Sequence, residues 1–196
     1  MNALIIIDMQ LDFLPGGALA VEHGDEVIPV INNLQGAYDL VVATQDWHPV
    51  DHKSFFTAHE GKQAFEQIVL HGLNQVLWPV HCVQETKGAA LAPALSTKAV
   101  EAVFRKGMDP EIDSYSGFFD NGRKKSTGMA DYLKGRGVTE VAVCGLAADY
   151  CVYYTANDAL DLGFKAGIIE EASRPIDRGR YEELKAIFRQ KGGQML

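Results

Sequence analysis

Three side chains with complementary chemistry each stand just after an apolar run. Asp8 follows 3–7, Lys106 follows 99–104, and Cys151 follows 138–143 after a short turn. A carboxylate beside a thiol can take its proton and later deliver it to a leaving amine. An ammonium group beside both lowers the thiol pKa and keeps the carboxylate ionised. Together the three residues predict acyl transfer, with Cys151 as nucleophile, Asp8 as base and Lys106 as electrostatic partner.

The segment around Cys151 supports this interpretation. It reads Gly145-Leu146-Ala147-Ala148-Asp149-Tyr150-Cys151-Val152. We expect Asp149 to cap a helix whose first turn holds the cysteine, so that the helix dipole lowers the thiol pKa. The small residues would let backbone amides approach an oxyanion. The alternative is that Cys151 is a small buried residue that packs a helix on a sheet.

A second group has the composition of a metal site. Asp46 and His48 flank Trp47 and lie on one side of an extended segment. His81, in Trp78-Pro79-Val80-His81-Cys82, could supply a third ligand, and such a set suits Zn²⁺, Fe²⁺ or Mn²⁺. Competing candidates are His52 and His71, and two polar residues at a strand end need no metal at all. Cys82 and Cys144 are interpreted as structural.

Three aromatic side chains come from irregular segments near these groups: Phe13, Trp78 and Tyr115. Aromatic residues in such segments more often cover a core than bind a ligand. They are also the walls that a flat aromatic substrate would need.

Strands and helices alternate along the chain. The apolar runs predict strands at 3–7, 40–44, 99–104, 138–143 and 166–169, and the helical spacing predicts helices at 24–37, 126–136, 150–162 and 179–190. This alternation indicates an α/β fold of three layers, α/β/α, with a mainly parallel central sheet in a single domain, 1–196. A long irregular region, about 47–97, is expected to bind metal and substrate. The reactive residues then share the carboxyl edge of the sheet, where α/β proteins bind ligands.

The composition of the chain excludes several classes of partner and location. The 196 residues are 47% hydrophobic and 22% charged, with a net charge of −8, which argues against nucleic-acid or membrane surfaces as partners. No apolar stretch approaches the roughly 20 residues that cross a bilayer, and the N-terminus has no signal-peptide pattern. Three cysteines, an odd number, fit a reducing cytoplasm. The sequence indicates no particular oligomeric state, and a homo-oligomer is compatible with it.

The chain resembles the nicotinamidases, also called pyrazinamidases, of the isochorismatase-like cysteine hydrolases. The resemblance runs from Ile5 to about Glu171. Besides the segments around Cys151 and His81, it rests on Asp8-Met9-Gln10-Leu11-Asp12-Phe13, Gln45-Asp46-Trp47-His48-Pro49, Phe104-Arg105-Lys106-Gly107 and Asp113-Ser114-Tyr115-Ser116. The aspartate, lysine and cysteine are shared across the superfamily, whereas the Asp-Trp-His and Trp-Pro-x-His-Cys segments are specific to the nicotinamidase branch.

The resemblance implies an isochorismatase-like hydrolase fold and roles for individual residues. The catalytic triad would be Asp8, Lys106 and Cys151, and the metal ligands would be Asp46, His48 and His81. The aromatic residues that contact the pyridine ring would be Phe13, Trp78 and Tyr115. The oxyanion hole would consist of the backbone amides of Ala147 and Cys151. A cis peptide would join Leu146 to Ala147. Some members add a histidine ligand from the loop after the Asp-x-His, where His52 stands here.

The implied reaction is hydrolysis of nicotinamide, and of pyrazinamide, to the acid and ammonia through a thioester, in NAD salvage. One divalent ion would serve it, zinc foremost, with Fe²⁺ or Mn²⁺ as alternatives. Two other functions stay open: a related amidase acting on a carbamoyl or non-aromatic amide without metal, and a non-catalytic protein that binds nicotinamide or metal.

Overall fold

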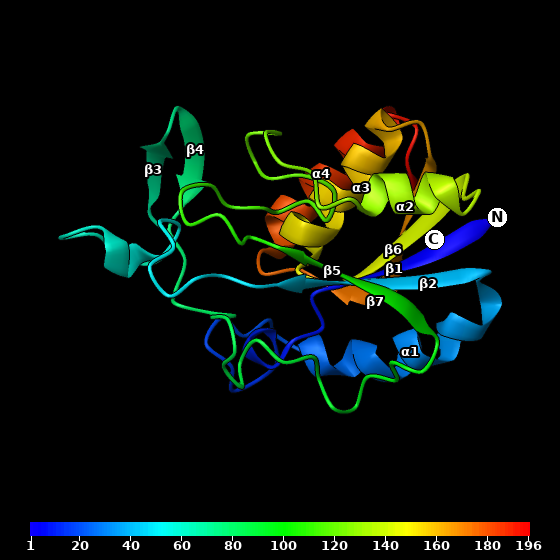
Figure 1. Cartoon of the computed structure of the whole chain (residues 1–196), viewed down its shortest axis with the longest axis horizontal. Coiled ribbons are helices and arrows are strands. Elements are labelled where there is room, and N and C mark those ends of the chain that lie inside the picture. The colour runs from blue at the N-terminus through cyan, green and yellow to red at the C-terminus, as the bar shows by residue number, and fades with distance from the viewer.

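A computed structural model describes residues 1–196. Its main sheet has six strands, and helices cover both faces of it (Figure 1). The strand order is β5-β2-β1-β6-β7-β8, and every neighbouring pair in it is parallel. The strands are β1 (Asn2–Ile7), β2 (Leu40–Asp46), β5 (Val100–Lys106), β6 (Glu140–Leu146), β7 (Lys165–Arg174) and β8 (Gln194–Met195). The expected three-layer fold with a mainly parallel sheet is confirmed.

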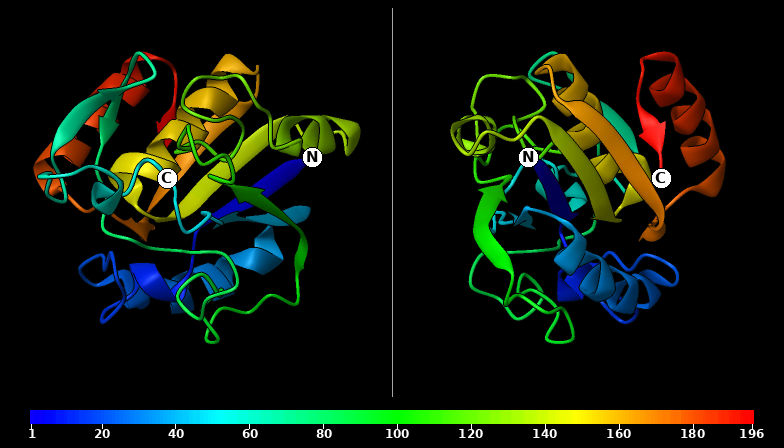
Figure 2. Two further views of the ribbon diagram at one scale, coloured as in Figure 1. Left: turned by 60° about the vertical axis from the view of Figure 1, so that its left-hand side comes forward. Right: turned by 90° about the vertical axis from the view of Figure 1, so that its right-hand side faces the viewer.

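The two faces of the sheet carry separate cores. Leu4 and Ile6 of β1 belong to the core under helix α1 (Val27–Leu34), whereas Ala3, Ile5 and Ile7 belong to the opposite one. That second core packs against α2 (Met129–Gly135), α3 (Tyr153–Asp161) and α4 (Arg178–Gln190). Figure 2 shows α1 on one side of the strands and α3 and α4 on the other. Because both faces of β1 are covered, its sequence is continuously apolar.

The expected elements exist, but several of their ends differ. Strand β6 continues three residues past the expected end at 143, and β2 and β5 each continue two residues past theirs, so that they reach Asp46 and Lys106. The expected helix at 150–162 divides into a π-helical turn, Ala148–Val152, followed by α3. The short strand β8 was not expected. No helix is long and apolar enough to traverse a bilayer.

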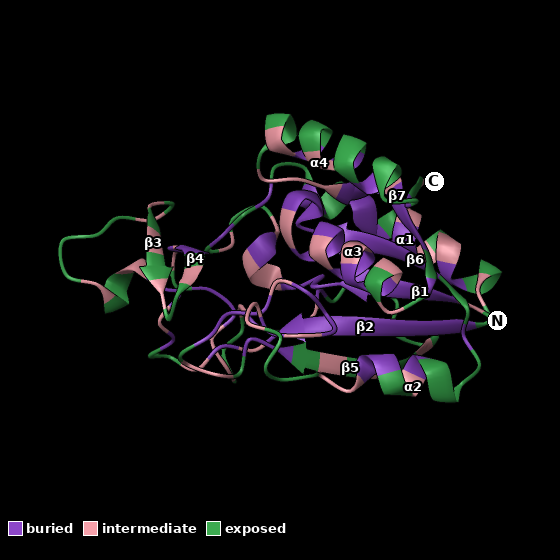
Figure 3. Cartoon of the chain, turned by 90° about the horizontal axis from the view of Figure 1, so that it is seen from above, coloured by how far each residue is buried: buried purple, intermediate pink, exposed green.

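The long region after β2 contains a hairpin that the sequence interpretation missed. Strands β3 (Gln67–Leu70) and β4 (Leu73–Val76) pair antiparallel across His71 and Gly72, which both have positive φ. A two-residue turn of this kind favours hairpins. Figure 3 shows the hairpin standing away from the buried strands β1 and β2, with several exposed residues. The segment after the hairpin carries Trp78 and His81, and further on Ala89, Ala92 and Leu95 join the core under α1.

Candidate active site

The carboxyl ends of four adjacent strands bring the reactive residues together. Lys106 and Asp46 are the last residues of β5 and β2 and are direct partners in the parallel register. Asp8 follows β1, and the turn that leads to Cys151 follows β6. The strand order therefore places lysine, aspartate, aspartate and cysteine side by side at one edge.

Lys106 is the centre of the buried polar network. Its Nζ lies 2.6 Å from Asp46 Oδ1, 2.9 Å from Asp8 Oδ2 and 3.4 Å from Cys151 Sγ, and it donates to the carbonyl of Ser114 at 2.9 Å. Burial opposes its charge, but the carboxylates of Asp46 and Asp8 hold its pKa well above the usual range. The ammonium group therefore stays charged between two carboxylates and a thiol.

The two carboxyl groups differ in protonation chemistry. Burial disfavours the charge of Asp46, but Lys106 outweighs burial and holds the Asp46 pKa well below its usual range. For Asp8, burial outweighs Lys106, and its pKa is raised. Asp8 Oδ1 also accepts a hydrogen bond from Thr44 Oγ1 at 2.7 Å. Asp8 thus has the properties of a proton carrier, whereas Asp46 stays a carboxylate.

The expectation of a lowered Cys151 pKa is wrong for this structure. Burial raises the pKa of the Cys151 thiol well above its ordinary value, and Lys106 opposes burial only in part. The expected cap is also absent: the Asp149 carboxylate accepts from the backbone N–H groups of Ile176 and Asp177, at 2.9 and 3.0 Å. Asp149 therefore ties the cysteine turn to the segment before α4 and caps no helix.

The backbone before Cys151 is shaped for close approach. A cis peptide joins Leu146 to Ala147, as the resemblance implied. Gly145 has φ +116°, and a Cβ there would overlap the carbonyl of Ile7, so only glycine fits. The N–H of Ala147 donates to no other group of the chain. An unpaired N–H beside a nucleophile is what an oxyanion requires.

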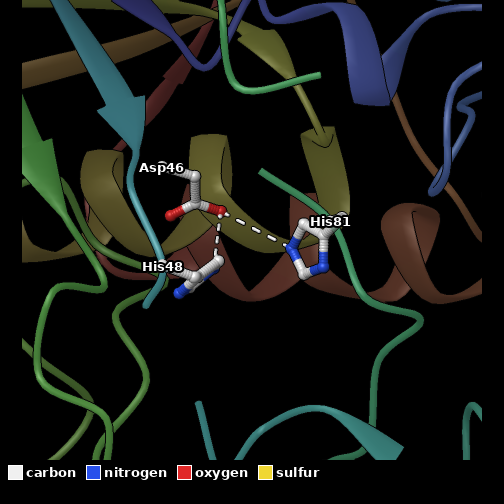
Figure 4. A group of neighbouring side chains, drawn as sticks. All are labelled: Asp46, His48 and His81. Atoms are coloured by element: carbon white, nitrogen blue, oxygen red, sulfur yellow. Dashed lines mark ion pairs between the residues drawn. The ribbon is translucent and has the colours of Figure 1, made fainter. Parts of the chain in front are cut away.

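Asp46, His48 and His81 form a compact cluster of potential metal ligands. Asp46 Oδ2 lies 3.4 Å from His48 Nε2 and 3.8 Å from His81 Nε2 (Figure 4). Atoms bound tetrahedrally to one zinc ion lie roughly 3.4 Å apart. The Nδ1 atom of each ring forms a hydrogen bond with a backbone carbonyl oxygen. His48 Nδ1 lies 2.9 Å from the carbonyl of Gly107, and His81 Nδ1 lies 2.8 Å from the carbonyl of Pro79. This arrangement turns both Nε2 lone pairs toward the carboxylate, so the residues fit a divalent ion.

The two competing histidines lie in different surroundings. His71 is half-exposed at the hairpin turn and pairs with Glu111 at 2.8 Å, away from the cluster. His52 is fully buried beside His48, with ring centroids 4.5 Å apart. Burial lowers the pKa of His52 to about 4, although Asp113 raises it in part, so this ring is neutral.

A narrow cleft opens onto both groups. Seven of the residues that line it were singled out from the sequence: Phe13, Asp46, Trp78, His81, Tyr115, Ala147 and Cys151. Asp8, Lys106 and His48 are buried beneath this lining. The wall is largely aromatic, since Tyr150 lies edge-on to Trp78 at 4.8 Å and to Tyr115 at 5.3 Å between ring centroids.

Four lining residues were missed: Leu19, Asp113, Tyr150 and Ile176. Tyr150 and Asp113 stand inside segments that the sequence analysis quoted, so their neighbours were a signal. Leu19 and Ile176 come from connecting loops and carry no local signal.

A buried thiol, an ammonium group and a carboxylate beneath a cleft at the edge of an α/β sheet are typical of a cysteine-dependent hydrolase. The chain belongs to the isochorismatase family, since the Isochorismatase domain matches residues 2–196.

Individual relatives agree with this assignment. The nicotinamidase of Escherichia coli is 47% identical over 180 residues, which cover 90% of this chain and 84% of that protein. A nicotinamidase/pyrazinamidase structure from Acinetobacter baumanii superimposes with a TM-score of 0.97 at 45% identity, over 100% of this chain and 95% of that one. The pyrazinamidase of Pyrococcus horikoshii in complex with zinc superimposes with a TM-score of 0.80 at 36% identity, over 100% and 98% of the two chains.

Proposed function

We propose that this chain is an amidohydrolase that converts nicotinamide to nicotinate and ammonia, and that it accepts pyrazinamide by the same chemistry. The observation that carries the proposal is the placement of the Cys151 thiol, backed by Lys106, at the floor of an aromatic cleft beside the Asp46–His48–His81 cluster. Relatives named for the same two activities support the substrate class. The product, nicotinate, would enter NAD salvage.

Two groups of residues would hold the substrate, the aromatic residues of the cleft and the metal ligands. Phe13, Trp78 and Tyr115 would enclose the pyridine ring. We place one divalent ion, zinc foremost, at Asp46, His48 and His81, supported by the zinc-bound relative. When bound, the ion would supply a Lewis acid for the ring nitrogen.

The first half-reaction forms a thioester. Asp8 takes the proton of Cys151 while Lys106 stabilises the thiolate, and Sγ attacks the carboxamide carbon. The N–H groups of Ala147 and Cys151 stabilise the oxyanion. Asp8 then gives the proton to the leaving nitrogen, the C–N bond breaks, and ammonia departs.

The second half-reaction restores the thiol. Asp8 removes a proton from water, the water oxygen attacks the thioester carbonyl, and the C–S bond breaks to release nicotinate. The proton returns to Cys151. The three free cysteines fit a reducing compartment, and we place the protein in the cytoplasm.

The test is ammonia release from nicotinamide by the purified protein. Cys151→Ala should abolish release and keep the metal content, since no cluster atom is removed. Cys144→Ala is the matched control because this thiol is buried within β6. Ammonia release by Cys151→Ala at the native rate would overturn the proposal.

A further inference from the structure

His52 has a fixed tautomer in this structure. Its Nδ1 accepts a hydrogen bond from the backbone N–H of Ser54 at 3.1 Å and lies 2.8 Å from Ser54 Oγ. A backbone N–H can only donate, so Nδ1 carries no proton. In the neutral ring the proton is therefore on Nε2.

This tautomer is opposite to that of the two histidines in the metal cluster. In His48 and His81 a carbonyl oxygen accepts from Nδ1–H, which leaves the lone pair on Nε2. A metal binds a nitrogen lone pair, and His52 presents a proton instead. His52 thus stands beside the cluster as a hydrogen-bond donor.

The Nε2–H of His52 lacks a partner although the residue is fully buried. The carboxylate of Asp113 is close by: one ring nitrogen each of His48 and His52 and one carboxylate oxygen of Asp113 lie within 4.8 Å of one another. Asp113 is itself fixed, because Oδ1 accepts from the Ser114 N–H at 2.7 Å and Oδ2 from Gln75 Nε2 at 3.1 Å. A buried donor and a buried acceptor across such a gap form a site for one water molecule.

We propose that His52 is not a metal ligand, and that His52 and Asp113 together bind a water molecule beside His48. The water accepts from Nε2–H and donates to the Asp113 carboxylate. The second lone pair of the water would remain for the ion, so that this water and not a third histidine would be the further ligand. His52 and Asp113 are then positioning residues for the cluster, and this inference rests on the metal site of the proposed function.

The experiment is ¹⁵N NMR of histidine-labelled protein, with and without zinc. On zinc addition, Nε2 of His48 and His81 should take the shift of a metal-bound nitrogen. His52 should keep a protonated Nε2 and an unprotonated Nδ1 in both states. His48→Ala and His52→Gln assign the signals.

Zinc affinity, measured by chelator competition, is the second readout. His52→Gln and Asp113→Asn should each keep one zinc per chain and weaken its binding by about 10- to 100-fold, as outer-shell changes do. Because both residues hold one water, the double variant should bind zinc about as well as the weaker single variant. Ser54→Ala is the matched control, since it removes the hydroxyl but keeps the backbone donor.

The outcomes separate the two proposals. If zinc shifts His52 Nε2 together with His48 and His81, the inference is wrong and the metal site stands. If zinc shifts none of the three, both the metal site and the inference are wrong. Additive losses of affinity in the double variant would refute the shared water.

Discussion

Replacing Lys106 with methionine should destabilise the metal-free protein strongly. The Lys106 side chain is fully buried and is the only lysine or arginine in contact with the carboxylates of Asp8 and Asp46. Removing one partner of a buried ion pair costs about 3–5 kcal/mol, because the other charge stays buried without compensation. The unfolding entropy is about 2.1 cal/mol/K per residue, so a chain of 196 residues has roughly 0.4 kcal/mol/K. The expected fall in Tm is therefore about 7–12 °C.

The pH dependence of this loss follows from the pKa of Asp46. In the native protein that pKa is lowered, so Asp46 contributes stability that is present at neutral pH and is lost as pH falls through the folded-state pKa. In Lys106→Met the buried carboxylate no longer has the ammonium group that outweighs burial, and its pKa should rise above the unfolded value. The difference in Tm between the two proteins should therefore shrink as pH falls from 7 toward about 4.

Calorimetric melts with and without zinc test both statements. Zinc should restore part of the lost stability, since the ion offers Asp46 a new positive partner. Ammonia release should stay abolished in the zinc-loaded variant, because nothing replaces the ammonium beside the thiol. With an unfolding entropy of about 2.1 cal/mol/K per residue, a fall in Tm of about 2 °C corresponds to less than about 1 kcal/mol. A metal-free Lys106→Met protein whose Tm falls by no more than this would refute the claim that Lys106 compensates the two buried carboxylates.

Three further changes test the supports of the site. Gly107→Ala should weaken zinc binding at least about 10-fold, because a Cβ at Gly107 would overlap the His48 ring. The control is Gly128→Ala, since Gly128 also has a positive φ but a Cβ there would meet no other atom. Thr44→Val removes the donor to Asp8 Oδ1, so kcat should fall about 10- to 100-fold and the acid limb of its pH profile should move to higher pH. An unchanged profile would separate Thr44 from proton transfer. Removing the ion with a chelator should raise KM for nicotinamide, and adding zinc should restore the original KM. An unchanged KM would show that the ion does not take part in substrate binding.

One physical reason allowed the sequence to predict both the three layers of the fold and the edge of the sheet at which the candidate site lies. Parallel strands buried on both faces read as continuous apolar runs, and their carboxyl ends share one edge. The polar residues just after 3–7 and 40–44 could therefore be placed together without any distance information. The pairing of Asp46 with Lys106 was out of reach, because it depends on the register of β2 against β5.

The misses come from contacts distant in sequence or from overlooked turns. Asp149 has the residue type of a helix cap, but it bonds the N–H groups of Ile176 and Asp177, which only the folded chain brings near. The hairpin β3–β4 had a local signal, His71-Gly72, between two short runs rich in branched residues. The role of His52 depended on which nitrogen accepts from Ser54, and the sequence does not contain that information.

The raised pKa of Cys151 changes where activation must come from. A thiol activated by a helix end would ionise before any substrate arrives, whereas this one is 7% exposed and its pKa is raised by burial. Its proton needs an acceptor within the site, and the raised pKa of Asp8 makes that carboxyl a better base than an ordinary aspartate. Lys106 contacts both groups, and in the proposed mechanism it would compensate the charge of the thiolate as it forms. In the proposed mechanism the triad would therefore generate the nucleophile during the reaction, and a helix end would not generate it in advance.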